Sequence, residues 1–355
     1  MRRLFYGAIV ALAACSSSKP TVERIGNGAT DAGDSGSPAE RDAAARDASS
    51  TDAYAPPKTY APLDFSAIGA PVEMRGDFLF TEGPIWDPKK QVLYFTDINA
   101  DTIFRLTLPD TFDVILNPMG NADGLALDPK GNLIAAGFVS RNIWRLDGSA
   151  MTALASDYQG KKLNSPDDLI ARSDGVIYFT DPTFGITGSQ GFTAQTAELA
   201  FQGVYRITTD GTLHLEDQTT SGPNGVQLSP DEKIAYVSYT GTGEIAAFDV
   251  AADGTLSGKR SFATGVTLAD SMCVDAGGNV YVASLAGITV LDPSGAKLGV
   301  IPTTGEVPTN CAFGGADQTT FFITARKNLL ATPTAGNSSL YRIDAMPIPG
   351  MPGLP

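Results

Sequence analysis

Short apolar strands separated by turns recur along the chain from about residue 70 onwards. The clearest unit begins at Glu82, continues through an apolar stretch at 84–86 and a turn, and ends in a second strand with the aromatic pair Tyr94 and Phe95. An acidic residue therefore stands in front of a strand–turn–strand unit. Runs of this length, bounded by Gly, Pro and Asp, are typical of an all-β fold.

The unit returns five more times at a spacing typical of repeat proteins. The second strands are centred at Tyr94, Ile134, Tyr178, Tyr236, Tyr281 and Phe322, at intervals of 40, 44, 58, 45 and 41 residues. A third strand follows each pair, and a fourth follows in the first five repeats. Four short strands with a period in the forties predict a six-bladed β-propeller with four-stranded blades.

The sixth repeat lacks a fourth strand of its own. After Ile343 the chain becomes rich in Pro and Gly, whereas residues 71–75, ahead of the first repeat, have strand character. We therefore expect an N-terminal strand to complete the last blade and close the ring, which leaves no long exposed sheet edge. The predicted propeller spans residues 63–345, and residues 346–355 form a Pro/Gly-rich tail.

The N-terminal part of the chain carries targeting signals. Arg2 and Arg3 precede a largely apolar run at 4–14, which is too short to span a bilayer as a mature helix. The run ends in Leu-Ala-Ala followed by Cys15, which resembles a bacterial lipobox; an ordinary cleaved signal is the alternative. Residues 1–15 are therefore predicted to be a lipoprotein signal peptide ending at a lipidated Cys15.

Residues 16–62 contain mainly Ser, Ala, Asp, Thr, Gly and Pro, with few large apolar side chains. Such a segment buries too little surface to offset its ordering entropy, so we expect a disordered tether. We expect a lipid-anchored protein of the bacterial cell envelope, in the periplasm or on the outer surface. The sequence leaves open which of the two membranes holds it.

Composition and charge narrow the function classes. Of the 355 residues, 43% are hydrophobic, which is enough for a packed core. The formal net charge of −14 argues against nucleic acid, whose phosphates would be repelled, and is compatible with a hard cation.

Six oxygen-bearing side chains occupy the same position in the six repeats. They lie 11 or 12 residues before the second-strand centres and are Glu82, Asp123, Asp167, Asn224, Asp270 and Asn310. Each stands at the start of an innermost strand, so we expect all six at one mouth of the central channel. Turn formation explains why Asp123 precedes Gly124. It does not explain Glu82, or why all six residues occupy the same position in their repeats. Several carboxylates buried together require protons or a cation.

The donor types favour Ca²⁺, with Mg²⁺ or Mn²⁺ as further possibilities and Zn²⁺ disfavoured. The only histidine of the chain, His214, lies in a strand outside this ring. The remaining cysteines, Cys273 and Cys311, lie in apolar strands, where we expect buried thiols, although an exported protein can pair them.

An ordered set of motifs resembles the senescence marker protein/gluconolactonase/luciferin-regenerating enzyme family over residues 70–343. The motifs are Glu82-Gly83-Pro84, Asn164-Ser165-Pro166-Asp167-Asp168, Tyr178-Phe179-Thr180-Asp181-Pro182-Thr183-Phe184-Gly185, Pro223-Asn224-Gly225 with Ser229-Pro230-Asp231, and Thr309-Asn310-Cys311-Ala312-Phe313-Gly314-Gly315. The resemblance implies a six-bladed fold, a divalent metal in the channel and lactonase or esterase-like activity. It also implies that Glu82, Asn224 and Asp270 bind the metal. Asp167 stands where the family usually has an Asn that contacts metal or substrate.

Lactone hydrolysis needs a polarised carbonyl and an activated water, which a channel Ca²⁺ and a nearby carboxylate can supply. By resemblance Asp270 is the candidate base, and Asp167 is either a rival base or a further metal ligand. The substrate-binding candidates are Asp123, Asp168 and Asn310. No His or Ser nucleophile occurs in the ring, which argues against an acyl-enzyme.

The long third interval contains residues 185–203, which form either a lid over the channel mouth or a passive insertion. Asp181, just before this segment, is expected to shape the strand exit. The leading hypothesis is a Ca²⁺-dependent lactonase acting on sugar or related small-molecule lactones. The alternatives are a metal-dependent phosphotriesterase or arylesterase and a non-catalytic, surface-anchored binding propeller. The complete oxygen ring favours the enzymes over the binder.

Overall fold

The computed structural model describes residues 59–148, 150–327 and 332–351. The chain divides into two units, Met1–Pro56 and Pro57–Pro355. The first unit, with the predicted signal peptide, Cys15 and most of the tether, lies outside the described residues. Within those residues the helices are two short 3₁₀ turns, η1 (Phe65–Ala67) and η2 (Phe184–Ile186), and no helix is long and apolar enough to cross a membrane.

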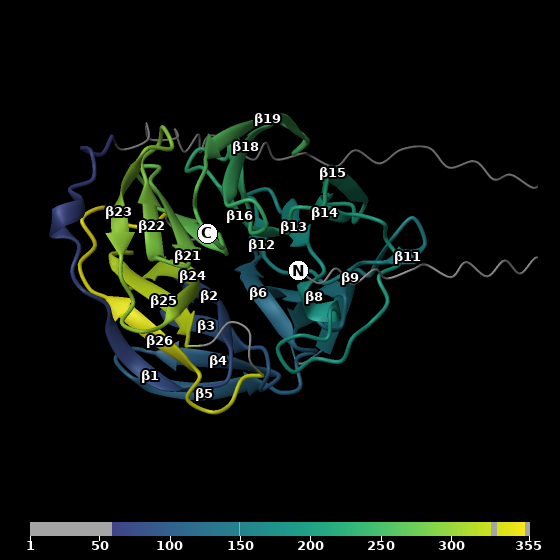
Figure 1. Ribbon diagram of the computed structural model, residues 1–355, viewed down its shortest axis with the longest axis horizontal. Helices are drawn as coiled ribbons and strands as arrows, with labels where there is room; N and C mark the ends of the chain where they lie inside the picture. Colours follow the sequence, from purple (N-terminus) through teal and green to yellow (C-terminus); the bar gives the residue numbers. More distant parts are fainter. Residues whose placement is uncertain (1–58, 149, 328–331, 352–355) are drawn as a thin grey trace, which may run out of the picture. The chain divides into compact units, whose positions relative to one another are not determined.

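Six four-stranded antiparallel sheets make up the second unit (Figure 1). The first three blades contain β2 (Thr81–Asp87), β3 (Val92–Asp97), β4 (Thr102–Thr107) and β5 (Thr111–Leu116); β6 (Ala122–Leu127), β7 (Leu133–Gly137), β8 (Asn142–Asp147) and β9 (Ala150–Ala155); and β12 (Leu169–Ala171), β13 (Ile177–Asp181), β14 (Gln202–Ile207) and β15 (Leu213–Thr219). Between the second and third blades lies a two-stranded hairpin, β10 (Asp157–Tyr158) and β11 (Lys161–Lys162), which the sequence pattern did not predict.

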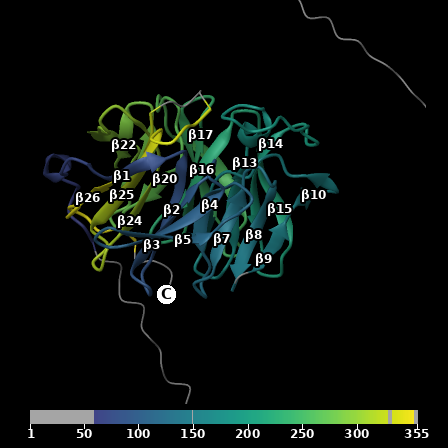
Figure 2. The same ribbon diagram turned by 90° about the horizontal axis from the view of Figure 1, so that it is seen from below.

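The other three blades follow the same order of strands. They contain β16 (Pro223–Leu228), β17 (Ile234–Tyr239), β18 (Glu244–Val250) and β19 (Leu256–Ala263); β20 (Met272–Val274), β21 (Val280–Ser284), β22 (Gly287–Leu291) and β23 (Lys297–Ile301); and β24 (Val307–Gly314), β25 (Thr320–Arg326), β26 (Ser338–Ile343) and β1 (Val72–Phe78). Figure 2, turned by 90°, shows three strands of one blade, β7, β8 and β9, side by side. The prediction of a six-bladed, all-β propeller is confirmed.

The N-terminal strand is the outer strand of the last blade. β1 pairs with β26 in antiparallel register, with Val72 opposite Arg342 and Phe78 opposite Ser338. Each innermost strand contacts the innermost strand of the next blade, and β2 contacts both β6 and β24. The first and last blades are therefore neighbours, and the innermost strands surround a central channel (Figure 1).

Apolar side chains pack between neighbouring blades and hold the innermost strands in place. The second-strand centres predicted from the sequence are all buried, and Phe95 and Phe179 beside two of them are fully buried. Phe179 stacks on Tyr205 with ring centroids 5.2 Å apart. Burial of this much aromatic surface is the main stabilising contribution to the ring.

Both ends of the described chain contribute to the core between the fifth and sixth blades. Tyr60 and Phe65 pack against this cluster at the N-terminal side. Met346 and Ile348, in the segment after β26, are buried in the same cluster. The segment continues to Met351, which reaches the central channel.

Candidate functional site

The structure brings all six predicted oxygen-bearing side chains to the same end of the innermost strands. Glu82, Asp123, Asn224 and Asn310 lie near the starts of β2, β6, β16 and β24, while Asp167 and Asp270 lie two residues before β12 and β20. Five of the six are buried, with at most 5% of their surface exposed, and Asp270 is more accessible. We call this end of the channel the mouth.

Hydroxyl groups from the second strands fix the backbone at the mouth. Each donates a hydrogen bond to a carbonyl oxygen in the following blade: Thr96 to Asp123 (2.9 Å), Thr180 to Asn224 (2.5 Å) and Ser238 to Asp270 (2.7 Å). All three hydroxyls lie two residues after a second-strand centre. A Thr or Ser at this spacing is visible in the sequence, but its role at the mouth was not predicted. In three of the six blades, these bonds position the site residue of the next blade.

Glycine allows the innermost strands to approach one another closely. A Cβ atom on Gly83, whose φ is +48°, would lie 2.4 Å from the carbonyl oxygen of Asp123. A Cβ atom on Gly225 would lie 2.7 Å from the Cα atom of Ser271. Since no larger residue fits at these distances, the Glu-Gly and Asn-Gly pairs are requirements of a narrow channel.

Burial and mutual repulsion disfavour ionisation of the mouth carboxylates. The pKa values of Glu82, Asp123 and Asp167 are raised well above their ordinary values, first by burial and then by neighbouring carboxylates. Burial raises the pKa of Asp270 to about 7, and hydrogen bonding by Asn224 opposes the shift. The four carboxyl groups, from four different blades, therefore lie close enough to interact electrostatically.

A buried arginine that the sequence analysis did not identify faces these acids. Arg326, at the end of β25, is fully buried, and its guanidinium lies 3.8 Å from the ring centroid of Phe80. Burial lowers its pKa to about 10, while Glu82 and Asp270 act in the opposite direction. An arginine at the end of an apolar strand is usually exposed, so its position beside the mouth was not predictable from the sequence.

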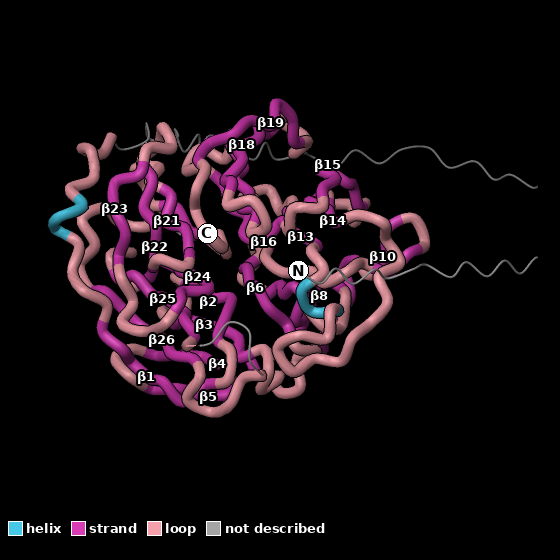
Figure 3. Tube along the Cα trace, viewed as in Figure 1, coloured by secondary structure: helices cyan, strands magenta, loops and turns pink. Residues whose placement is uncertain are grey.

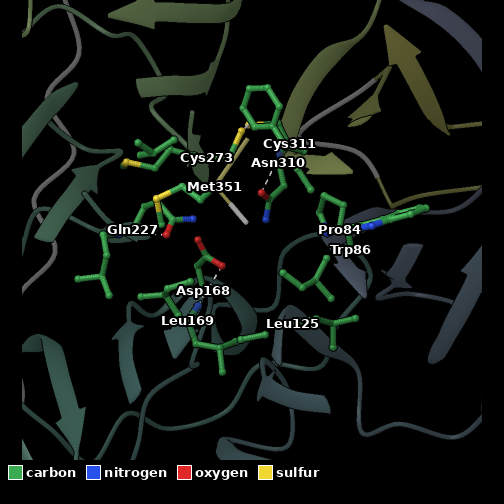
Figure 4. A pocket seen from close by; sticks show the side chains of 18 of the residues that line it. Pro84, Trp86, Leu125, Asp168, Leu169, Gln227, Cys273, Asn310, Cys311 and Met351 are labelled. Atoms are coloured by element: carbon green, nitrogen blue, oxygen red, sulfur yellow. Dashed lines mark hydrogen bonds between the residues drawn. The ribbon is translucent and has the colours of Figure 1, made fainter. Parts of the chain in front are cut away.

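The channel continues from the mouth into a cavity of about 150 Å³. Asp168 and Asn310 point into it, and Met351 lies at its wall together with mainly apolar side chains of the innermost strands (Figure 4). Asp168 accepts hydrogen bonds from the backbone N–H groups of Leu169 (2.9 Å) and Val226 (3.2 Å), and burial raises its pKa to about 7. Asp168 and Asn310 therefore connect the polar mouth to an apolar chamber.

Two other titratable residues singled out in the sequence lie outside the mouth. Asp181 accepts hydrogen bonds from the backbone N–H groups of Asn164 (2.8 Å) and Ser165 (2.7 Å), so it shapes the chain around the strand exit. His214 lies in the outer strand β15, opposite Arg206 of β14. Neither residue is placed to act on a molecule at the mouth.

The segment that separates β13 from β14 crosses the mouth side of several blades. It consists of η2 and a long loop (Figure 3), and we call residues 184–203 the lid segment. At its tip the Asn99 side-chain amide donates to the Gln190 carbonyl oxygen (2.9 Å), and Gly191 packs against Thr332. Phe192 stacks edge-on against Phe138, with centroids 5.7 Å apart.

These contacts connect the third blade to the second, through Phe138, and to the first, through Asn99 in the β3–β4 turn. Thr332, in the β25–β26 connection, adds a contact with the sixth blade. Of the two interpretations of this segment, a lid fits the contacts better than a passive insertion.

The side chains at the mouth are the types that bind a hard divalent cation. Five carboxylates and one guanidinium lie here, those of Glu82, Asp123, Asp167, Asp168, Asp270 and Arg326. Their formal charge, when all are ionised, is −4. A divalent cation would halve this charge. Across the described residues, no group of three or more His, Cys, Asp or Glu side chains is already arranged to hold a metal. The metal ligands implied by the resemblance are the carboxylates of Glu82 and Asp270 and the amide oxygen of Asn224.

Comparisons with known proteins identify the family of this chain. Residues 80–327 match the SMP-30/Gluconolactonase/LRE-like region. A gluconolactonase from Zymomonas mobilis is 31% identical over 295 residues, which cover 75% of this chain and 82% of the relative. The structure of a gluconolactonase from Xanthomonas campestris superposes with a TM-score of 0.70 at 34% identity, covering 78% of this chain and 90% of that one.

A more distant solved structure shares the fold. Regucalcin from Agrobacterium tumefaciens, a calcium-binding protein, superposes with a TM-score of 0.63 at 19% identity, covering 80% of this chain and 95% of that one. At this identity the likeness extends to the arrangement of the blades. The chain thus shares a family signature with the two gluconolactonases and a fold with regucalcin.

Proposed function

Because this chain belongs to the SMP-30/gluconolactonase/LRE-like family, we propose that it is a metal-dependent hydrolase that opens sugar lactones or related small lactones. Lactone hydrolysis is the activity named for the relatives from Zymomonas mobilis and Xanthomonas campestris, which cover most of this chain. The observation that carries the proposal is the set of oxygen-bearing side chains from six blades at one mouth. Neither of these two names favours phosphotriester hydrolysis or a purely binding role.

Glu82, Asn224 and Asp270 would hold the metal, with Asp167 as an additional ligand or a base. When bound, Ca²⁺ supplies a Lewis acid for the lactone carbonyl oxygen. The acid-rich, buried donor set supports a hard cation, and the amide of Asn224 is already hydrogen-bonded to Asp270. Mg²⁺ and Mn²⁺ are compatible with the same donors.

Asp270 is the best placed of the mouth carboxylates to activate water. It is the most exposed of the six ring residues, and a carboxylate beside the metal can accept a proton from water. The proton from the attacking water is held at the Asp270 carboxylate and returned to the ring oxygen of the lactone as that bond breaks. Asn310 and Asp168 are positioned to contact the part of the substrate that enters the channel.

A panel of lactones and esters tests the proposal. The purified protein should hydrolyse glucono- and pentono-lactones in the presence of Ca²⁺, and EDTA should abolish the rate until Ca²⁺ is restored. Aryl esters and phosphotriesters serve as competing substrates. Faster turnover of either class than of any lactone would contradict the assignment, as would full activity in EDTA.

We also propose that the mature protein is anchored in the cell envelope through a lipid on Cys15. The proposal rests on the apolar run at 4–14 and the small residues before Cys15, which lie outside the described residues. The wild-type protein should partition with membranes, and Cys15→Ser should release it into the soluble envelope fraction. Equal partitioning of both proteins would contradict lipidation at this residue.

A further inference from the structure

Two cysteines from neighbouring innermost strands meet beside the channel. Cys273 lies in β20 of the fifth blade and Cys311 in β24 of the sixth, and their Sγ atoms are 2.6 Å apart. Non-bonded heavy atoms normally stay about 3.5–4 Å apart. No side chain therefore separates the two sulfurs, which lie within reach of a covalent bond.

The surroundings of the two thiols favour pairing with each other over other chemistry. Both residues are buried, with 6% and 3% of their surfaces exposed, in the core cluster that includes Tyr281 and Phe313. Within the described part of the chain, no further His, Cys, Asp or Glu group completes a metal site around them. Burial raises the pKa of the Cys273 thiol, so it is a poor nucleophile toward external reagents in the folded protein.

We propose that Cys273 and Cys311 form a disulfide bond that joins the innermost strands of the fifth and sixth blades. During folding, before the two thiols are buried, one protein thiolate attacks a small-molecule disulfide, which is the oxidant, and releases one small thiol. The second protein thiolate then attacks the mixed disulfide and releases the other. Two protein thiols are oxidised and one disulfide is reduced to two thiols, so atoms and electrons balance.

The bond would lie next to the mouth without contributing to its chemistry. Asn310 directly precedes Cys311, and Asp270 lies three residues before Cys273, so the cross-link would fix the spacing of the two blades that carry these residues. It would also close a loop of 38 residues and reduce the freedom of the unfolded chain. This inference does not depend on the proposed lactonase activity.

Peptide mapping tests the bond directly. Trypsin should release residues 261–297 and 298–326 as separate peptides, each with one of these cysteines, while Cys15 lies in a third peptide. The full-length protein, refolded with oxidised and reduced glutathione, denatured and alkylated, should yield the first two peptides joined and about 2 mass units lighter than their sum. Reduction before alkylation should separate them. Recovery of both as alkylated single peptides, or linkage of either to Cys15, would overturn the proposal.

Thermal unfolding gives a second measurement. Reduction should lower the melting temperature of the oxidised protein by about 5 °C. The double variant Cys273→Ala/Cys311→Ala is the matched control, and its melting temperature should not respond to the reductant. An unchanged melting temperature of the wild-type protein on reduction would contradict a bond that stabilises the ring.

Discussion

Asp270 differs from the other mouth residues in its exposure, and this difference gives it a distinct role. Asp123 and Asp167 are buried, whereas Asp270 is partly exposed. Asp270→Asn keeps the size of the side chain but removes the proton acceptor. We expect the turnover number for any lactone substrate to fall by about 100-fold or more, because general base catalysis typically contributes that much.

Steady-state kinetics at saturating Ca²⁺ would measure this loss, with circular dichroism to confirm the fold. Asp110→Asn, in the exposed turn between β4 and β5, removes the same charge away from the channel and should leave turnover unchanged. Retention of wild-type turnover by Asp270→Asn would remove Asp270 as the base and leave Asp167 as the candidate.

Asp167 adds a charge at a position where the family resemblance implies an amide. Asp167→Asn keeps an oxygen donor but removes one negative charge from the mouth. We expect the calcium dissociation constant to rise by about 10-fold, since ligand charge tunes Ca²⁺ affinity. Isothermal titration calorimetry would measure it, again with Asp110→Asn as the control. An unchanged affinity would place Asp167 outside the coordinating set.

At the residue scale the sequence predicted the six mouth positions because each has a fixed offset from a buried strand centre. It did not predict Arg326, since a charged residue at a strand end is exposed far more often than buried. The guanidinium's position depends on Phe80, more than two hundred residues away in the chain. A pattern within one repeat contains no information on such a contact.

At the element scale the strands were predictable and the connections between blades were not. The alternation of apolar runs and turns placed the innermost and second strands of every blade. The β10–β11 hairpin was missed because Asp157–Tyr158 and Lys161–Lys162 are short and polar. The length of the lid segment was visible in the sequence, but its path depends on contacts with other blades, such as that of Asn99 with Gln190.

Two contacts should hold the tip of the lid segment in place. Phe192→Ala removes the ring that packs against Phe138, and Asn99→Ala independently removes the hydrogen bond to the Gln190 carbonyl oxygen. Each variant should open the tip locally without unfolding the blades, because neither residue belongs to a strand of the propeller.

Limited proteolysis with thermolysin would detect this opening. We expect faster cleavage within residues 184–203 in both variants than in the wild-type protein, with little change in melting temperature. Leu298→Ala, at a partly exposed position on the outer strand β23, is the control and should be cleaved at the wild-type rate. Wild-type cleavage rates in both lid variants would show that these contacts do not hold the segment in place.

At the scale of the whole molecule, the number of blades followed from the repeat period, since each repeat must bury its faces against two neighbours. Closure of the ring then required a fourth strand for the last blade, and β1 provides it. What the period could not predict is the electrostatic state of the channel. That state depends on how closely six strand ends approach one another, and on Gly83 and Gly225, which permit the approach.

This concentration of acids determines how stability should depend on pH. The pKa values of Glu82, Asp123 and Asp167 are raised in the folded protein above those of the unfolded chain. The metal-free folded state therefore binds more protons than the unfolded state above the ordinary carboxyl pKa of about 4. Its stability should fall as pH rises from 5.5 to 8, a range that spans the pKa of about 7 of Asp168 and Asp270.

A bound divalent cation replaces those protons, so its effect on stability should grow over the same pH range. Melting temperatures measured in EDTA and in saturating Ca²⁺ should differ little at pH 5.5 and most at pH 8. KCl at matched ionic strength is the control, since screening by salt acts weakly on buried charges. If Ca²⁺ raises the melting temperature equally at the two pH values, or does not raise it at pH 8, the cation does not neutralise the mouth carboxylates.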